Sequence, residues 1–440
     1  MKDRRFVVRA LASSTLLVWV ACSSGEPTSG SSTPASSEGG AEGGDAQADG
    51  AFDAAVVADA GDAGNFDAAD AAPRLHSDIS AGRPPACGAH PSAAIDRANG
   101  KLLVVTEDIG FGFQETSRPT LFRCNLDGTA CTHTDISAGQ AQGCGIDPAL
   151  LVDAVNSKLL LISRSFESSF RSSLIRCNLD GTSCTHADIS AGEGVSSGYS
   201  PSPVIDSANG KLLVVTMNTQ QKPSLFRCNL DGTSCVHSDI SAGQGSGSGL
   251  QPSAVIDTVN GKLLAVTNNV DKSNRASLFR CDLDGTSCTH TDISAGEPGN
   301  SGNEPSAVID AVNGKLLVVT ANTASSGKPS LFRCNLDGTS CAHTDISAGQ
   351  GASSGDYPSA VVDAVNGKLL VVTQNGGNSF KPSLFRCNLD GTSCTHTDVS
   401  AGQGPQCGQN PFAMIDSANG KLLVVADDGL KPGLFLVPLK

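Results

Sequence analysis

From residue 75 to the C-terminus, short apolar runs alternate with polar turns in a pattern that repeats along the chain. In the fifth copy this pattern predicts four strands, at Ser306–Asp310, Lys315–Thr320, Ser330–Asn335 and Cys341–Ser347. Asn-Gly lies between the first two strands and Asp-Gly between the last two. Both dipeptides are typical of tight hairpins because Gly and Asn tolerate positive φ. No segment has a sustained 3.6-residue apolar period, so helices are not expected.

Seven copies of this unit are marked by a proline that precedes the first strand. The anchoring prolines are spaced by 51 to 57 residues and are Pro91, Pro148, Pro201, Pro252, Pro305, Pro358 and Pro411. Four-stranded units of this length are typical of β-propellers, whose blades pack around a central channel. A linear stack of small sheets is the alternative.

The two ends of the repeat region decide between these folds. The region begins with a lone fourth strand, Leu75–Ser80, and ends with a lone third strand, Leu434–Val437. Together they complete one blade, as expected if their pairing closes a ring and leaves no exposed sheet edge. We therefore predict an all-β fold: a seven-bladed β-propeller of four-stranded antiparallel blades, closed by pairing of the N-terminal strand with the C-terminal strand.

A short motif between the third and fourth strands points to a group of known proteins. Asn-Leu-Asp-Gly-Thr occurs at 125–129, 178–182, 229–233, 335–339 and 388–392. It resembles the LDG turn of YWTD-type and NHL-like propellers, and the whole chain resembles bacterial propeller lipoproteins with low-complexity stalks. The resemblance implies binding of proteins or other ligands, with some enzymes among the relatives.

The first 22 residues have the form of an export signal. A basic start precedes the apolar run Leu11–Ala21, which is shorter than the ~20 residues of a permanent membrane span. The segment Val18–Cys22 resembles the lipobox of bacterial lipoproteins. We therefore expect a signal peptide at 1–21 and lipidation of Cys22, with an ordinary signal peptide as the alternative.

Residues 22–74 predict a linker between this signal and the propeller at 75–440. They are rich in Ser, Gly, Ala and Asp and lack apolar clusters, so they cannot bury enough surface to fold. The net charge of −14 disfavours nucleic acid as a partner. We expect an exported monomer, lipid-anchored at the bacterial outer membrane or cell surface and contacting the membrane only through that anchor.

Twelve of the 16 cysteines form six Cys-x6-Cys pairs across the Asp-Gly turns. The pairs are Cys124 and Cys131, Cys177 and Cys184, Cys228 and Cys235, Cys281 and Cys288, Cys334 and Cys341, and Cys387 and Cys394. Opposite residues of antiparallel strands lie ~4.5–5.5 Å apart, within reach of a disulfide. We predict six disulfides. Thiolate metal binding is the alternative, but its ligands are usually more closely spaced.

Three further cysteines, Cys87, Cys144 and Cys407, lie four residues before the anchoring proline in blades 1, 2 and 7. These blades are neighbours in a closed ring. We predict one disulfide between two of them, with the third left over. A Cys87–Cys407 bond would join the two ends of the ring, and cross-linking stabilises most when it closes a long loop. A three-thiol metal or redox site, and unpaired or intermolecular thiols, are the alternatives.

The connections on one face differ between copies, whereas the turns on the other face are nearly identical. Loops on a rigid scaffold usually carry recognition, and the least repetitive loops belong to blades 7, 1 and 2. We predict a ligand site there. Its aromatic candidates are Phe111, Phe113, Phe166, Phe170, Tyr199 and Tyr357.

Blades 1 and 7 also end their second strands with two acidic residues each, Glu107-Asp108 and Asp427-Asp428. Four carboxylates on adjacent blades would suit Ca²⁺, which prefers several oxygen ligands. Solvated acidic loop ends are the simpler interpretation, and no other cofactor is expected.

A His-x-Asp triplet occurs seven times, once for each blade, and a group repeated in this way is expected to serve the sheet rather than catalysis. The chain contains no Gly-x-Ser-x-Gly elbow, phosphate-binding loop or His-Glu-x-x-His motif. We therefore favour a non-catalytic binding or scaffold module for a protein, peptide or glycan. A hydrolase or lyase with a metal at the channel mouth is the second hypothesis, and a purely structural surface repeat is the third.

Overall fold

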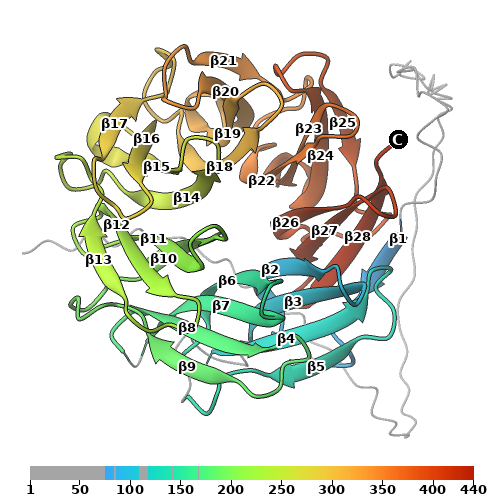
Figure 1. Ribbon diagram of the computed structural model, residues 1–440. Helices are drawn as coiled ribbons and strands as arrows, with labels where there is room; N and C mark the ends of the chain where they lie inside the picture. Colours follow the sequence, from blue (N-terminus) through green and yellow to red (C-terminus); the bar gives the residue numbers. More distant parts are fainter. Residues whose placement is uncertain (1–74, 84–85, 109–116, 141–142, 167) are drawn as a thin grey trace, which may run out of the picture. The chain divides into compact units, whose positions relative to one another are not determined.

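The computed structural model describes residues 75–440 except 84–85, 109–116, 141–142 and 167. The chain divides into two units, Met1–Asn65 and Phe66–Lys440, and every described residue belongs to the second. Its strands form seven four-stranded antiparallel sheets, which surround a central axis as blades (Figure 1). The predicted seven-bladed β-propeller is confirmed.

From the axis outward, each blade contains strands A, B, C and D. The A strands are β2 (Ala89–Asp96), β6 (Ile146–Asp153), β10 (Tyr199–Asp206), β14 (Leu250–Asp257), β18 (Asn303–Asp310), β22 (Asp356–Asp363) and β26 (Gln409–Asp416). The B strands are β3 (Lys101–Asp108), β7 (Lys158–Ser165), β11 (Lys211–Met217), β15 (Lys262–Asn269), β19 (Lys315–Asn322), β23 (Lys368–Asn375) and β27 (Lys421–Asp427). The C strands are β4 (Arg118–Asn125), β8 (Arg171–Asn178), β12 (Pro223–Asn229), β16 (Arg275–Asp282), β20 (Lys328–Asn335), β24 (Lys381–Asn388) and β28 (Pro432–Pro438). The D strands are β5 (Thr132–Asp135), β9 (Thr185–Asp188), β13 (Val236–Asp239), β17 (Thr289–Asp292), β21 (Ala342–Asp345), β25 (Thr395–Asp398) and β1 (Leu75–Asp78).

Short 3-10 turns follow the B strands of blades 4, 5 and 6. They are η3 (Val270–Lys272), η4 (Thr323–Ser325) and η5 (Gly376–Asn378). The last Asn of each B strand caps its turn, as Asn322 does by accepting a hydrogen bond from the Ser325 amide. No helix among the described residues is long and apolar enough to cross a membrane.

The ring closes as predicted, through β1. This N-terminal strand pairs antiparallel with β28, and Leu75 lies opposite Leu436. The imidazole of His76 packs against Phe435 with ring centroids 4.8 Å apart, and its Nε2 lies 3.0 Å from Asp428 Oδ2. Blade 7 is therefore completed by strands from the two ends of the folded unit.

The hydrophobic core lies between the blades rather than at the axis. In β19, Leu316 and Val318 pack into a cluster shared with blade 4, whereas Leu317 and Val319 pack into one shared with blade 6. Both faces of a blade are covered, so the B strands are continuous apolar runs instead of alternating ones.

The A–B turn is longer than the Asn-Gly signal suggests. In blade 5 it spans residues 311–314, and the buried carboxylate of Asp310 braces it. Asp310 Oδ1 accepts a hydrogen bond from the Asn313 amide (3.1 Å), and Oδ2 accepts one from Asn313 Nδ2 (2.7 Å). Gly314 has a φ of 61°, which glycine adopts without steric cost. The Asp that ends strand A therefore holds the A–B turn in place.

The His-x-Asp triplets make local contacts, as predicted. In blade 5 the ring of His343 packs on Phe332 at 5.2 Å, and its Nε2 lies 3.0 Å from Ser330 Oγ. Asp345 Oδ1 accepts a hydrogen bond from the Ser347 amide (2.8 Å). The histidine thus fixes strand D to strand C, and the aspartate lies where strand D ends.

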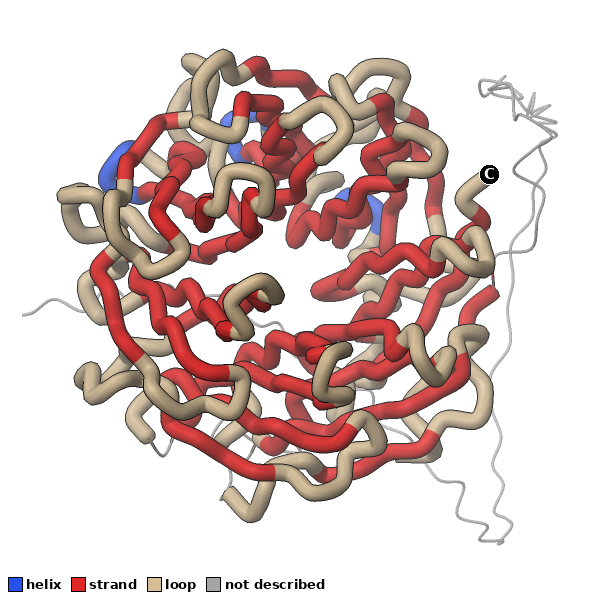
Figure 2. The backbone as a smooth tube through the Cα atoms, viewed as in Figure 1, coloured by secondary structure: helices blue, strands red, loops and turns tan. Residues whose placement is uncertain are grey.

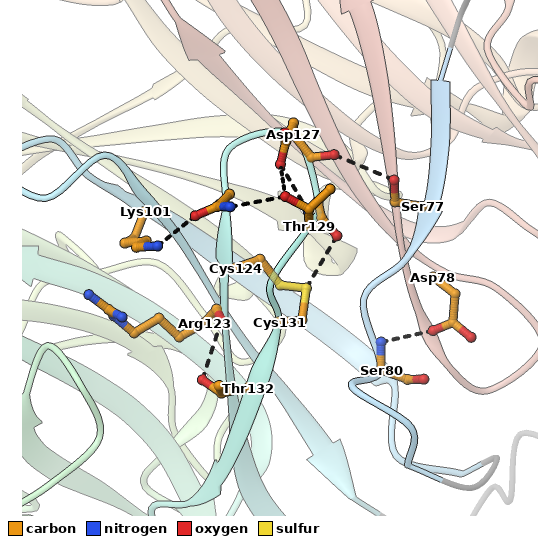
Figure 3. The surroundings of a disulfide bond; sticks show 12 residues. Ser77, Asp78, Ser80, Lys101, Arg123, Cys124, Asp127, Thr129, Cys131 and Thr132 are labelled. Carbon is orange, nitrogen blue, oxygen red and sulfur yellow. Dashed lines mark hydrogen bonds between the residues drawn. A yellow bond between two sulfur atoms is a disulfide. The ribbon is translucent and has the colours of Figure 1, made fainter.

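All six predicted C–D disulfides are present, with Cα atoms 4.0–4.1 Å apart. Figure 3 shows the Cys124–Cys131 bond of blade 1, with the closing strand beside it: Ser77 Oγ of β1 lies 3.5 Å from the Asp127 carbonyl oxygen. Disulfides persist in oxidising compartments, so these six bonds indicate an extracytoplasmic protein.

The predicted Cys87–Cys407 disulfide is wrong, because both residues are free, buried thiols. Each is enclosed in its own D–A connection, at the position that Ser301 occupies in blade 5. The Cys87 carbonyl is fixed there by a hydrogen bond from the Thr106 hydroxyl, as the Ser301 carbonyl is by Thr320. Burial raises the pKa of the Cys407 thiol to about 11, which keeps it protonated and unreactive.

Candidate functional site

Each A strand begins within a Gly-x-x-Pro segment in which only the two middle residues vary. Glycine and proline occur in all seven blades. The residues between them are Ala-His, Ile-Asp, Tyr-Ser, Leu-Gln, Asn-Glu, Asp-Tyr and Gln-Asn in blades 1 to 7, with no residue type repeated at either position. The chain has only two tyrosines, and both lie here, as Tyr199 and Tyr357.

The glycine is required because neighbouring blades touch at this point. A Cβ atom on Gly355 would lie 2.3 Å from the nitrogen of Pro329, in the C strand of the preceding blade. A Cβ atom on Gly302 would lie 2.1 Å from the nitrogen of Ala276. No side chain fits at these distances, so the segment is held tightly against the neighbouring blade.

The residue before the proline bulges out of strand A. In blade 5, Asn303 pairs with Ala321 and Ser306 with Val319, so Glu304 and the proline share one opposite residue. Such bulges redirect a side chain and tolerate proline, which has no amide hydrogen. The bulged residues have φ values of 47–52° and are His90, Asp147, Ser200, Gln251, Glu304, Tyr357 and Asn410. Left-handed conformations are uncommon for such residues, and here one occurs in every blade.

The seven bulged residues and their prolines line a cavity of about 340 Å³ at the axis, which we call the central cavity. In Figure 2 the A strands surround this axis. The volume is at the lower end of the ~300–1,000 Å³ range of ligand sites. The lining offers an imidazole, two carboxylates, a hydroxyl, two carboxamides and a phenol, one group from each blade.

Hydrogen bonds join the lining residues of blades 4, 5 and 6. Gln251 Oε1 accepts from the Glu304 amide (3.2 Å), and Glu304 Oε2 accepts from the Tyr357 amide (2.6 Å). The side chain of Tyr357 is 46% exposed. Burial raises the pKa of Glu304 to about 7 and that of the adjacent Asp356 to about 6. Near neutral pH, Glu304 is therefore present in both its protonated and its ionised form.

The predicted calcium ligands do not come together. Among the described residues, no three His, Cys, Asp or Glu side chains are placed to hold a metal ion. Glu107 and Asp108 are successive residues of a strand, so their side chains point to opposite faces. The partners are His90 for Glu107 (3.2 Å), Arg83 for Asp108, the Leu430 amide for Asp427 (2.6 Å) and His76 for Asp428 (3.0 Å).

Two of these carboxylates belong to the surroundings of the central cavity. The hydrogen bond with Glu107 raises the pKa of His90. Burial raises the pKa of Asp427 to about 7. Blades 7 and 1 thus place an imidazole and buried acidic groups beside the cavity instead of a metal centre.

Three of the predicted aromatic residues form one cluster, from blades 2 and 3. Phe170 stacks on Tyr199 with centroids 5.7 Å apart, and Phe166 packs edge-on against Phe170 at 5.2 Å. Tyr357 lies apart from this cluster and lines the central cavity at blade 6. The cavity is lined by residues from all seven blades, whereas the sequence predicted a site at blades 7, 1 and 2. Phe111 and Phe113 lie outside the described residues.

The fold and its lining define a seven-bladed β-propeller with a ring of varied side chains at one end of its axis. No protein-family model matches the chain, and no curated protein matches it.

Solved structures of bacterial propellers are similar in fold. A lectin from Burkholderia pseudomallei has a TM-score of 0.58 and 7% identity, with 80% of this chain and 96% of the lectin covered. The extracellular domain of a putative hybrid two-component system from B. thetaiotaomicron has a TM-score of 0.53 and 13% identity, with 84% and 43% covered. A protein of unknown function from Dyadobacter fermentans has a TM-score of 0.51 and 12% identity, with 83% and 98% covered. At these identities the likeness shows the fold alone.

Proposed function

We propose that this protein is an exported binding module whose ligand, a segment of a protein, a peptide or a glycan, occupies the central cavity. One observation carries the proposal: seven copies of one backbone segment present seven different side chains to one cavity. A purely structural repeat has no need of such variety between a constant glycine and a constant proline. The lectin and the sensor domain among the similar structures bear names of binding proteins, which is consistent with this role.

The cavity's chemistry favours a polar ligand. Its lining is made of hydrogen-bonding groups and proline rings, and the prolines offer small apolar surfaces between the polar groups. Ligand sites commonly combine apolar walls with a few placed polar groups that fix orientation. Hydroxyl and amide groups of a ligand would match the carboxamides, the phenol and the carboxylates.

Binding by the full-length protein to arrays of glycans and peptides tests the proposal. For any ligand retained, Tyr357→Ala and Glu304→Gln are expected to lower the affinity at least tenfold, because both side chains line the cavity. Val312→Ala is the control, since Val312 lies on an A–B turn at the opposite face and is 80% exposed. A ligand whose affinity is unchanged in both cavity variants would place binding elsewhere.

We extend the proposal to an envelope lipoprotein in which Cys22 is lipidated and residues 22–74, which lie outside the described residues, link this anchor to the propeller. The six disulfides support an oxidising compartment. Cells fed radiolabelled palmitate are expected to label the wild-type protein but not Cys22→Ala. An unlabelled wild-type protein, or equal labelling of both, would contradict the anchor.

A further inference from the structure

The B–C loop of blade 2 holds a phenylalanine in an unfavourable backbone conformation. Phe170 has a φ of 62°, and its carbonyl accepts a hydrogen bond from Gly198. The matching loop residues of blades 3 to 7 also have positive φ, between 56° and 73°, and are Gln221, Asn274, Gly327, Phe380 and Leu430. The left-handed conformation, which is unfavourable for a bulky residue, is thus a property of this loop rather than of blade 2. Particular to blade 2 is that the residue is an aromatic ring that stacks on the first residue of the next A strand, Tyr199.

The strained residue forms part of an aromatic platform, which consists of Phe166, Phe170 and Tyr199. Phe170 and Tyr199 are stacked with an interplanar angle of 21°, and Phe166 meets Phe170 at 87°. Phe166 is 38% exposed, so the platform ends in an accessible ring. Because Tyr199 directly precedes Ser200, which lines the central cavity, the platform is continuous with the proposed site.

An arginine fixes the boundary between platform and cavity. The Cζ atom of Arg164 lies 4.7 Å from the ring centroid of Tyr199 and 5.3 Å from that of Phe170. Its Nε lies 2.9 Å from Oδ2 of Asp147, which lines the central cavity. The Arg164 side chain is only 12% exposed, and that of Asp147 is 28% exposed. The arginine charge is thus neutralised, and it holds a partly accessible carboxylate beside the aromatic rings.

An aromatic surface beside a fixed carboxylate matches the two faces of a sugar. A pyranose ring has a flat face of C–H groups, which packs on aromatic rings, and a rim of hydroxyls, which donate to carboxylates. The ion pair of Arg164 and Asp147 carries no net charge and offers little attraction to anions, and the ionised form of Glu304 repels them. Acidic glycans and phosphorylated ligands are therefore disfavoured, and neutral glycans are favoured.

We propose that the aromatic platform is a subsite for a neutral glycan: one sugar ring stacks on it, a hydroxyl donates to Asp147, and the rest of the glycan enters the central cavity. This inference rests on the proposed function, to which it adds the ligand class and the direction in which the ligand leaves the cavity.

Calorimetric titration of the full-length protein tests the inference. The probes are neutral gluco-, manno- and galacto-oligosaccharides, uronic-acid oligosaccharides and aromatic peptides. At least one neutral oligosaccharide is expected to bind, with an affinity at least tenfold above that of the acidic series. Preferential binding of the acidic oligosaccharides or of the peptides would overturn the ligand class.

Phe170→Gly separates binding from folding. The substitution relieves the left-handed backbone, which offsets part of the stability lost with the ring contacts of Phe170, while glycan affinity is expected to fall at least tenfold. Phe380→Gly is a matched control, because Phe380 has a φ of 60° at the same loop position in blade 6, while the residue of the next blade that corresponds to Tyr199 is Gln409. It is expected to affect the melting temperature in the same way and to leave glycan affinity unchanged. Phe166→Ala, at an exposed ring, is expected to weaken binding without unfolding.

The outcomes distinguish this inference from the proposed function. If a neutral glycan binds and Glu304→Gln weakens it while Phe170→Gly and Phe166→Ala do not, the subsite is wrong and the central cavity stands. If none of the three substitutions changes the affinity, both are wrong.

Discussion

On the face of the A–B and C–D turns, polar side chains bond within their own turns, whereas around the central cavity they change from blade to blade. Asp310 binds Asn313, and Asp337 Oδ1 accepts from the Thr339 hydroxyl (2.7 Å), in arrangements repeated in other blades. At the cavity, by contrast, the backbone is fixed by glycine and proline, and the side chain between them takes no part in forming the turn.

The carboxylates on the two faces show the same contrast in their pKa values. Hydrogen bonds from Thr339 lower the pKa of Asp337, which lies on the turn face. Burial raises the pKa of Glu304 and Asp427 to about 7 at the cavity. The turn face uses ionised groups to hold its structure, while the cavity keeps acidic groups partly protonated. This difference is expected if, as proposed, stability and recognition are assigned to separate positions of the repeat.

The largest loss of stability is expected for a substitution at the glycine of a Gly-x-x-Pro segment, where neighbouring blades touch. Gly355→Ala places a Cβ atom against the backbone of Pro329, and the overpacking is expected to destabilise the fold by about 3 kcal/mol or more. Gly351→Ala is the matched control, because a Cβ atom there meets nothing within 4 Å. Urea unfolding followed by circular dichroism measures both. Equal stability of the two variants would show that the blades do not approach this closely.

A smaller effect is expected at the turn face. Asp310→Ala leaves two donors of Asn313 without their partner, at a cost of about 1–3 kcal/mol. Val312→Ala in the same turn is expected to change stability by less than about 0.5 kcal/mol, because Val312 is exposed. Neither substitution should alter ligand affinity. A loss of affinity in Asp310→Ala, with the fold intact, would break the division between the faces.

The smallest effect concerns pH. Because the pKa of Asp427 is about 7 in the folded protein and near 4 when unfolded, folding binds a proton between these values. The stability linked to this proton is fully present below about pH 4 and is lost as pH rises to 7. Asp427→Asn does not titrate and keeps an oxygen for the Leu430 amide. The variant should melt a few degrees above the wild type at pH 8 and together with it at pH 4. A lower melting temperature of Asp427→Asn than of the wild type at pH 8 would contradict the raised pKa of Asp427.

The sequence predicts the blades well because their signals are local. Strand alternation, the Asp-Gly turns and the Cys-x6-Cys spacing each lie within a few residues, so the blades and the six disulfides could be predicted. The ring closure could be predicted from the incomplete units at the two ends of the repeat region. That β18 begins at Asn303 instead of Ser306 could not be predicted, because a bulge interrupts the two-residue period on which strand prediction depends.

The candidate site was only partly predictable. Phe166, Phe170 and Tyr199 were recognised singly, but their stacking depends on how blades 2 and 3 pack. The central cavity was missed because its signal appears only when the seven copies are aligned: two varied positions between a constant glycine and proline. The Cys87–Cys407 pairing failed for a related reason, since an equivalent repeat position does not imply proximity.

Site-directed blocking tests the central claim, that ligands bind at the central cavity. A cysteine introduced by Ser200→Cys lies at the cavity, and one introduced by Val312→Cys lies on the opposite face. Each is introduced into a Cys22→Ala background and coupled to a maleimide-linked polyethylene glycol, because the described cysteines outside the disulfides are buried. We predict that coupling at position 200 abolishes binding of the ligand identified on the arrays and that coupling at position 312 leaves it intact. Full binding after coupling at position 200 would contradict the account.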